Sequence, residues 1–431
     1  MDLHNANAYS RRRFIEKGVA LASACTTIPA FMERSALAMT QQAGATTSST
    51  PGLPEDRVLV VVQLGGGNDG LNTVIPYRDD AYYRARSSIA IDRHRVLTLD
   101  RREDVGLHPN MKALKSLYDD GLLSIVQGVG YPNPDRSHFT SMDIWHTARR
   151  SGIGDGWLGK FFDNECAGAP GGCPQAASVS IGEETPLALS GSSHTPVNFL
   201  KPERFKWSNE ARSDEMKRAY EHILDAPDDA HAGNPTADFL TRTAMDARVV
   251  SAEMRKAIET EPLVNYPRHD FGQQLAMVGS MIRSGMPTRV YYVSMGGFDT
   301  HAGQGGERGK HASLLNRFST AMRSFSNDLK KQGNDGRVLT MCFSEFGRRV
   351  GQNGSNGTDH GTAAPMFLMG PMVRPGVLGR HPSLVDLDQG DLKHQVDFRS
   401  VYASILDRWL GADDHKILGE RFRPANVLRR V

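Results

Sequence analysis

Four short polar segments of this sequence carry side chains of the kind that bind metal ions in proteins. They are GGGNDG with Asp69, GGFDTH with Asp299 and His301, SEFGRR with Glu345, and GTDHGT with Asp359 and His360. A carboxylate and an imidazole together suit Zn, Mn or Fe, whereas Ca prefers oxygen alone. Because Asp299 and His301 are two residues apart, both side chains point the same way on an extended loop. We predict that these residues form a site for one or two divalent ions, with Zn first and Mn, Fe or Ca as alternatives.

Each segment also has a purely structural interpretation. Asn68-Asp69-Gly70 is an ordinary turn sequence, and Asp299 could cap a helix. Glu345 could form a structural ion pair with Arg348. Four such segments in one chain favour a shared metal site over four unrelated turns.

An ester hydrolase also needs a nucleophile and a group that stabilises negative charge. Ser137 begins a predicted helix, where free backbone N–H groups and the helix dipole favour an anion, and a nearby metal ion would lower the pKa of its hydroxyl. An ordinary helix N-cap is the alternative. The planar guanidinium of Arg348 matches the oxygens of phosphate or sulfate, so we predict that it contacts the substrate. His138, next to Ser137, is left without an assigned role.

Apolar runs of strand length precede three of the four segments. The predicted strands span residues 57–64, 122–126, 179–181, 288–295 and 337–343, and the predicted helices span 110–119, 137–148, 270–285, 310–331 and 398–410. Strands that alternate with helices predict an α/β fold with a mostly parallel, doubly wound sheet. Ligands of such sheets bind beyond the carboxyl ends of the strands, which is where Asp69, Asp299 and Glu345 fall.

The N-terminal residues are typical of an export signal. SRRRFIEK at residues 10–17 matches a twin-arginine signal, and an apolar run and the small-residue sequence Ala36-Leu37-Ala38 follow it. A basic amphipathic helix is the alternative. We predict a signal peptide over 1–38, recognised by the twin-arginine export machinery, a linker over 39–55, and a periplasmic or secreted protein. The apolar run is too short to span a bilayer, so no stable membrane span is expected after cleavage.

Residues 56–431 form the predicted α/β domain, which contains a helical insertion at about 200–262. This insertion is charged, is rich in Ala, Met and Glu, and has no strand-like run. We interpret it as a cap that sets access to the site.

Charge and cysteine content narrow the partners. The chain has 51 basic and 49 acidic residues, and residues 1–38 hold five and three of them, so the mature chain has a formal net charge of zero. Nucleic acid and anionic membranes demand a basic surface, so neither is expected as a partner. Cys166 and Cys173 bracket a Gly/Pro-rich loop and are expected to form a disulfide in an oxidising compartment. Cys342 lies in an apolar run and is expected to be a buried thiol.

Six linked motifs, together with the twin-arginine start, resemble a known family. They are LGGGNDGLNTVIPY, DRSHF, VSMGGFDTHAGQ, SEFGRR, GTDHGTAAPMFLMG and VDFRSVYASILDRWLG, which cover nearly all of residues 57–411. They resemble the exported proteins grouped as domain of unknown function fifteen hundred and one, similar to the alkaline phosphatase and sulfatase superfamily. The resemblance implies an alkaline-phosphatase-like α/β core with ligands from successive strand ends and a Ser, Thr or formylglycine nucleophile at a helix start.

The same likeness implies two metal positions. Asp69, Ser137 and Glu345 would gather at one, and Asp299, His301 and His360, with Asp359 nearby, at the other. Alkaline phosphatases have an Asp-His pair where this chain has Glu345-Phe346, and they space the residues of the DTH segment more widely, so one or two ions remain open. Ser137 lacks the sequence context that sulfatases need to make formylglycine.

The sequence therefore predicts a periplasmic metal-dependent hydrolase of phosphate or sulfate esters, whose substrate is a small-molecule or polymeric anionic ester. A catalytically degenerate binding or assembly protein that keeps the fold is the alternative, and the missing imidazole after Glu345 favours it. A redox metalloprotein is a third interpretation, suggested by the export route alone. The sequence has no haem attachment motif and no Cys-plus-Met ligand spacing to support it.

Overall fold

The computed structural model describes residues 56–100, 102–167, 173–174, 176–200 and 250–429. Its strands are β1 (Val58–Leu64), β2 (Val74–Ile75), β3 (Leu97–Leu99), β4 (Arg102–Leu107), β5 (Leu123–Gly130), β6 (Ser178–Ile181), β7 (Val197–Phe199), β8 (Val290–Met295), β9 (Val338–Phe343), β10 (Ala364–Met369), β11 (Gly376–Leu378), β12 (Leu387–Asp388), β13 (Asp391–Leu392) and β14 (Val396–Asp397). Its α-helices are α3 (Gly70–Thr73), α4 (Asp80–Ala85), α5 (Lys112–Asp119), α6 (His138–Thr147), α7 (Trp157–Glu165), α10 (Asp270–Arg283), α11 (Lys310–Gln332), α12 (Phe398–Ile405) and α13 (Asp414–Leu418). Three predicted segments lie outside the described residues: the signal peptide, the linker, and residues 201–249 of the insertion.

One sheet of nine strands forms the centre of the molecule. Its order is β11-β5-β10-β9-β1-β8-β6-β7, and β14 also pairs with β5. β1 is parallel to β8 and β9, β6 is parallel to β7 and β8, and β11 and β14 are parallel to β5. Among the described strands of this sheet, β10 alone is antiparallel to its neighbours, β9 and β5. The predicted α/β fold with a mostly parallel sheet is confirmed.

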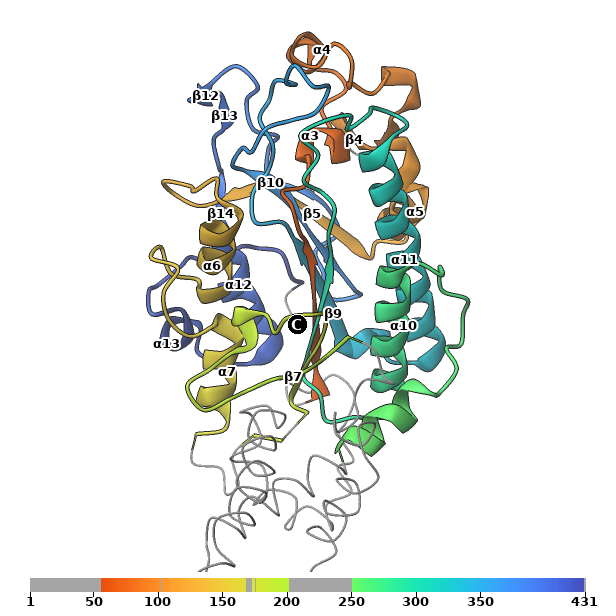
Figure 1. The fold of residues 1–431 in the computed structure, drawn as a ribbon, viewed down its shortest axis with the longest axis vertical. Coiled ribbons are helices and arrows are strands. Elements are labelled where there is room, and N and C mark those ends of the chain that lie inside the picture. Colours follow the sequence, from red (N-terminus) through yellow and green to blue (C-terminus); the bar gives the residue numbers. More distant parts are fainter. Residues whose placement is uncertain (1–55, 101, 168–172, 175, 201–249, 430–431) are drawn as a thin grey trace, which may run out of the picture.

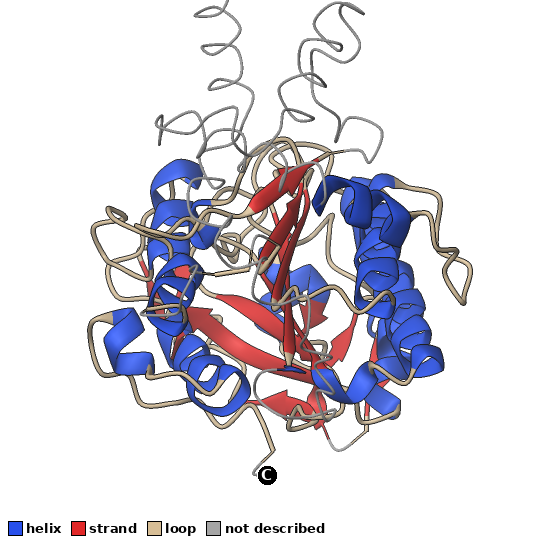
Figure 2. Ribbon diagram, turned by 90° about the horizontal axis from the view of Figure 1, so that it is seen from below, coloured by secondary structure: helices blue, strands red, loops and turns tan. Residues whose placement is uncertain are grey.

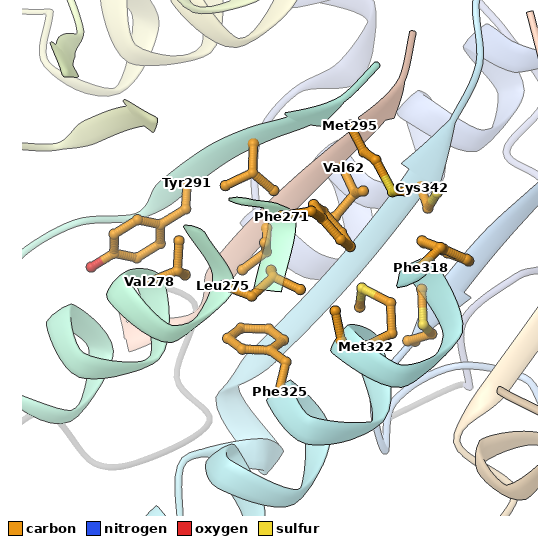
Figure 3. Close-up of a cluster of buried hydrophobic side chains, with 14 of the residues drawn as sticks. Val62, Phe271, Leu275, Val278, Tyr291, Met295, Phe318, Met322, Phe325 and Cys342 are labelled. Atoms are coloured by element: carbon orange, nitrogen blue, oxygen red, sulfur yellow. The ribbon is translucent and has the colours of Figure 1, made fainter. Parts of the chain in front are cut away.

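Helices cover both faces of the sheet. α5, α10 and α11 lie on one face, and α6, α7, α12 and α13 lie on the other (Figures 1 and 2). In β1, Val60 and Val62 pack toward α10 and α11, whereas Leu59 and Val61 pack with the residues of α6, α7 and α12. Figure 3 shows Val62 in the first of these clusters, near Phe271. A strand buried on both faces has to be apolar along its whole length, which explains the continuous Val/Leu run.

The direction of β10 decides where the fourth polar segment lies. β1, β8 and β9 are parallel, so the residues that follow them reach the same edge of the sheet. β10 runs in the opposite direction, so the residues that precede it reach that edge as well. Asp359 and His360 precede β10 and therefore meet the segments that follow the other three strands.

Short elements gather at one end of the molecule. α3, α4 and the β12–β13 hairpin lie at the same end in Figure 1, together with β4 of a three-stranded sheet of order β2-β4-β3. β2 has two residues and β3 has three. Runs this short carry no measurable periodicity, and the sequence analysis did not predict them.

The end of the predicted insertion and the cysteines can be compared with the structure. Residues 250–258, at the end of the predicted insertion, are helical, and Val250, Met254 and Ala257 pack into the cluster beneath α10 and α11. The bounds of the insertion stay a prediction. The disulfide between Cys166 and Cys173 is confirmed, and Cys342 is a buried thiol as expected. Within the described residues, no helix combines the length and the apolarity that a membrane crossing requires.

Candidate metal centre

Asp299 lies where the polar segments meet. It follows β8 by way of Gly297, whose φ of 98° lets the chain turn sharply. Its Oδ1 accepts a hydrogen bond from Nη2 of Arg348 at 2.6 Å and lies 3.0 Å from Nε2 of His301 and 3.2 Å from Nε2 of His360. Partial burial would raise the pKa of Asp299, but the hydrogen bond from Arg348 and the nearby His360 ring outweigh it and lower the pKa to about 2. Asp299 is therefore a carboxylate at neutral pH.

Three imidazole rings surround this carboxylate. They come from the start of α6, from the loop after β8 and from the loop before β10. Besides the two contacts given above, Nε2 of His138 is 3.6 Å from Oδ2 of Asp299, and the Nε2 atoms of His301 and His360 are 2.9 Å apart. One ligand atom from each of His138, Asp299 and His360 lies within 4.8 Å of the others. These atoms are close enough together to share one ion.

Each imidazole is held in place by its other ring nitrogen. Nδ1 lies 2.8 Å from Oε1 of Glu345 in His138, 3.2 Å from Oδ1 of Asp359 in His301, and 2.8 Å from the carbonyl oxygen of Arg136 in His360. All three partners are hydrogen-bond acceptors. A neutral imidazole carries one proton, and with that proton on Nδ1 each ring presents a lone pair on Nε2 to the centre.

The Nε2 atoms of His301 and His360 therefore face each other and Oδ1 of Asp299, and Nε2 of His138 faces Oδ2 of the same carboxylate. Arg348 offsets part of the negative charge of Asp299, but it donates to none of the three nitrogens. Such a group of acceptors repels itself unless a proton or a metal ion lies among them. Imidazole nitrogens and a carboxylate oxygen are donors that Zn, Mn and Fe accept, so His138, Asp299 and His360 fit a divalent ion.

Glu345 and Asp359, both predicted as ligands, lie behind the imidazoles. Glu345 is buried, and its Oε1 also accepts a hydrogen bond from the backbone N–H of Gly66 at 2.8 Å. Burial would raise the pKa of Glu345, but the hydrogen bond from His138 outweighs it and lowers the pKa. Asp359 accepts a second hydrogen bond from Nδ2 of Asn353 at 3.0 Å, which lowers its pKa. In these positions the two carboxylates fix the tautomer and orientation of His138 and His301, as outer partners of metal-binding histidines commonly do.

Asp69 is not brought to the imidazoles. Its side chain is fully buried, and its Oδ2 accepts hydrogen bonds from Nη1 of Arg86 and Nε2 of Gln304, each at 2.5 Å. Its Oδ1 accepts from the backbone N–H of Leu71 at 3.2 Å and so caps α3. Burial would raise the pKa of Asp69, but Arg86 outweighs it and lowers the pKa. This geometry favours the structural interpretation of the NDG turn over ligation of an ion.

Arg348 connects the loops instead of pointing into open space. Its side chain is completely buried. Besides Asp299, it donates to the carbonyl oxygens of Gly67 at 2.6 Å, Thr358 at 2.8 Å and Phe298 at 3.2 Å, and to that of Gly66. With its donors used in this way, the buried Arg348 holds the loops together, and this geometry favours a connecting role over its predicted contact with a substrate.

Ser137 lies beside the centre because its two neighbours belong to it. The carbonyl of Arg136 holds His360, and the ring of His138 faces Asp299. Ser137 is exposed, and its hydroxyl makes no capping hydrogen bond to α6. The sequence analysis gave His138 no role, although its position after a predicted nucleophile at a helix start was a usable signal.

Asp391 is a further residue that the sequence analysis missed. It is buried in β13, and its Oδ2 accepts a hydrogen bond from Nε of Arg136 at 2.8 Å. Its Oδ1 is 3.9 Å from Nε of Arg349. Asp391 therefore holds the backbone segment whose carbonyl binds His360. No motif marks it, because Arg136 and Asp391 are 255 residues apart.

A cavity of about 990 Å³ opens next to the centre. His138, Asp299 and Glu345 contribute to its wall, and the rest of the wall comes from β1, β8, α6, α10, α11 and residues 182–187. His138 and Asp299 therefore border a space large enough for an organic substrate.

Comparison with known proteins identifies relatives by sequence and by chain path. Residues 56–422 match the family described as "Protein of unknown function (DUF1501)". No curated protein matches the sequence.

Three solved structures with a related chain path are examples of this likeness. The PsFucS1 sulfatase from Pseudoalteromonas sp. has 10% identity and a TM-score of 0.39, with 96% of this chain and 77% of that chain covered. The lipoteichoic acid synthase LtaP from Listeria monocytogenes has 8% identity and a TM-score of 0.38, with 89% and 79% covered. The phosphonate monoester hydrolase SpPMH from Silicibacter pomeroyi has 10% identity and a TM-score of 0.29, with 85% and 77% covered. Likenesses at this level carry no conclusion about function.

The role of Arg348 as a connector predicts a large loss of stability in Arg348→Lys. A lysine keeps the charge but offers one nitrogen to acceptors that the guanidinium reaches with three, so buried carbonyls lose their partners. We expect the free energy of unfolding to fall by at least about 3 kcal/mol in urea titrations followed by circular dichroism. Arg349→Lys, at the neighbouring half-exposed position, is the control and should change it by less than about 0.5 kcal/mol. Equal stability of the two variants would contradict this role.

Asp69→Asn separates the structural role of this residue from ligation of an ion. Because Asp69 and Arg86 are both fully buried, the variant leaves a buried unpaired charge, and we expect a loss of about 3–5 kcal/mol in unfolding free energy. The metal content of the folded variant, measured by elemental analysis, should equal that of the wild type. Loss of the metal with unchanged stability would show that Asp69 is a ligand.

Proposed function

The chain belongs to the family described as protein of unknown function DUF1501, as its motifs predicted, and we propose that it is a metal-dependent hydrolase of phosphate or sulfate esters. The predicted twin-arginine signal at residues 1–38 supports a periplasmic or secreted location.

One observation carries this proposal. One ligand atom from each of His138, Asp299 and His360 lies within 4.8 Å of the others. His138 and Asp299 line a cavity, and each of the three imidazole rings at the centre is held by a separate acceptor. Structural metal sites are usually closed by protein ligands, whereas catalytic sites open toward a substrate. A donor set that borders a cavity of about 990 Å³ fits the second kind.

Phe346 favours a single ion. Its ring centroid lies 4.9 Å from that of His138 and 4.7 Å from that of His360. An apolar ring therefore stands beside the imidazoles at the position where the resemblance to alkaline phosphatases implies a further ligand. Two imidazole nitrogens, from His138 and His360, with a carboxylate oxygen of Asp299 suit Zn, with Mn and Fe as alternatives.

A divalent ion bound here supplies Lewis acidity, which draws electron density from an ester oxygen and lowers the pKa of a nearby hydroxyl or water. The protein itself fixes the positions of the donor side chains relative to the bound substrate. Glu345, Asp359 and the carbonyl of Arg136 fix the three rings, and Arg348 fixes the loop that carries Asp299.

Ser137 is the proposed nucleophile. Its Oγ attacks the phosphorus or sulfur, the bond to the alcohol breaks, and the alcohol leaves with a proton. Water then hydrolyses the serine ester and restores the hydroxyl. Backbone N–H groups in the first turn of α6 are directed to the same side and favour the negative charge that develops. They take over the role that was predicted for Arg348.

Turnover and metal content test this function together. The mature protein, loaded with Zn or Mn, is assayed with aryl phosphates, aryl phosphodiesters and aryl sulfates. His360→Ala should lose metal affinity by more than the roughly 10–100-fold that loss of an outer partner costs, and should lose turnover with it. Ser137→Ala should keep the metal and lower kcat by at least about 100-fold. His94→Ala, at an exposed position outside the centre, is the control and should change neither.

Metal binding without turnover of any ester class would contradict the hydrolase. It would instead support the alternative of a binding or assembly protein that keeps the fold and the ion.

A further inference from the structure

A chain of three hydrogen-bonded side chains forms part of the cavity wall next to the candidate metal centre. Gln63 lies in β1, Tyr292 in β8 and His146 in α6, and all three line the cavity. The hydroxyl of Tyr292 donates to Oε1 of Gln63 at 2.5 Å, and Nε2 of His146 lies 3.0 Å from the same hydroxyl. Because the hydroxyl has one proton and gives it to Gln63, His146 must be the donor in the second bond.

This chain leaves one donor and one acceptor for a ligand. The carbonyl oxygen of Gln63 is engaged, so its Nε2 amide group is left to donate. Nε2 of His146 is engaged, so its Nδ1 is left to accept. Within the described part of the protein, neither Nε2 of Gln63 nor Nδ1 of His146 has a hydrogen-bond partner. The His146 side chain is buried, with a relative exposure of 7%. Buried polar groups in proteins usually have a hydrogen-bond partner, so a bound ligand is the expected partner of these two groups.

The three hydrogen-bonded side chains are also uncharged. Burial lowers the pKa of His146 to about 4, and burial raises the pKa of Tyr292 well above its ordinary value. A neutral amide donor beside a neutral imidazole acceptor matches hydroxyl groups, which both accept and donate, better than it matches an anion or a cation.

The remaining wall disfavours a second negative charge. Asp143, Glu183, Glu184 and Asp270 line the cavity, and Arg317 is the basic residue among its lining. Phe139, next to His138, is 85% exposed and offers an apolar face. A group with hydroxyls along its edge and C–H bonds on its face can use both features at once.

We propose that this cavity binds the alcohol part of the substrate as a neutral, polyhydroxylated group, with Gln63 and His146 as its hydrogen-bond partners and Tyr292 as the residue that positions both. The inference rests on the proposed function for the identity of the ester, but the polyol contact itself does not require turnover. It favours an ester of a small polyol over an ester within an anionic polymer.

The experiment measures binding and needs no catalysis. The mature protein is titrated, with and without Zn, with methyl α-glucoside, with glycerol, and with 2-methoxytetrahydropyran, a ring without hydroxyls, and binding is followed by saturation-transfer NMR and calorimetry. We expect at least one of the two polyols to bind more tightly than the ring without hydroxyls. Tyr292→Phe and Gln63→Leu should each weaken polyol binding by roughly threefold to tenfold, the cost of one hydrogen bond.

Tyr291→Phe is the matched control. Tyr291 is the neighbour of Tyr292 in β8, but its ring packs into the cluster beneath α10 and α11 (Figure 3). It removes one buried hydroxyl from the same strand and should leave polyol binding unchanged. Thermal unfolding of all three variants checks that the fold is kept.

The outcomes separate this inference from the proposed function. Polyol binding that depends on Tyr292, in a protein that hydrolyses no ester, would support the inference and contradict the hydrolase. Hydrolysis of aryl esters in a protein that binds polyols no better than 2-methoxytetrahydropyran, or equally well in Tyr292→Phe, would overturn the inference and leave the hydrolase in place.

Discussion

The buried guanidinium of Arg348 is the interaction on which the arrangement of the centre depends. Arg348 belongs to the loop after β9, and it binds backbone oxygens in the loops after β1 and β8 and in the loop before β10. A guanidinium is planar and its donors have fixed directions, so these oxygens can satisfy it in one relative placement of the loops. The same side chain binds Asp299 and thereby ties the placement of the loops to the centre itself.

A second buried ionic group, the Asp69–Arg86 pair, helps Arg348 to hold the loops. Asp69 and Arg86 form a fully buried pair, Gln304 bridges Asp69 to the loop after β8, and Thr358 donates to Gln304 at 2.7 Å. Burial of ion pairs gains little net stability, since desolvation offsets the attraction, but removal of one partner is costly. Such a network penalises alternative loop positions more than it stabilises the correct one, which is the property that a site built from four loops requires.

The sequence predicted the scaffold better than the roles of the polar residues. A continuous apolar run such as 57–64 has one stable environment, the middle of a covered parallel sheet, so the strands and their carboxyl ends were predictable. The roles of Asp69, Glu345 and Asp359 were not, because a carboxylate that ligates an ion and one that orients an imidazole or an arginine occupy the same kind of loop. What distinguishes them is a partner far away in sequence, such as Arg86 for Asp69 or His138 for Glu345. The antiparallel direction of β10, which brings His360 to the others, also depends on pairing that no local pattern encodes.

Contacts that involve no ion hold the donors of this centre. In small zinc domains the ion holds the chain together, and the free energy of binding is spent on folding. Here Arg348 and the Asp69–Arg86 pair tie the loops together, and each imidazole has its own acceptor. A divalent ion bound among the donors would offset the repulsion between their lone pairs and Asp299. Loops that are tied together by the protein itself lower the cost of ordering them when an ion binds.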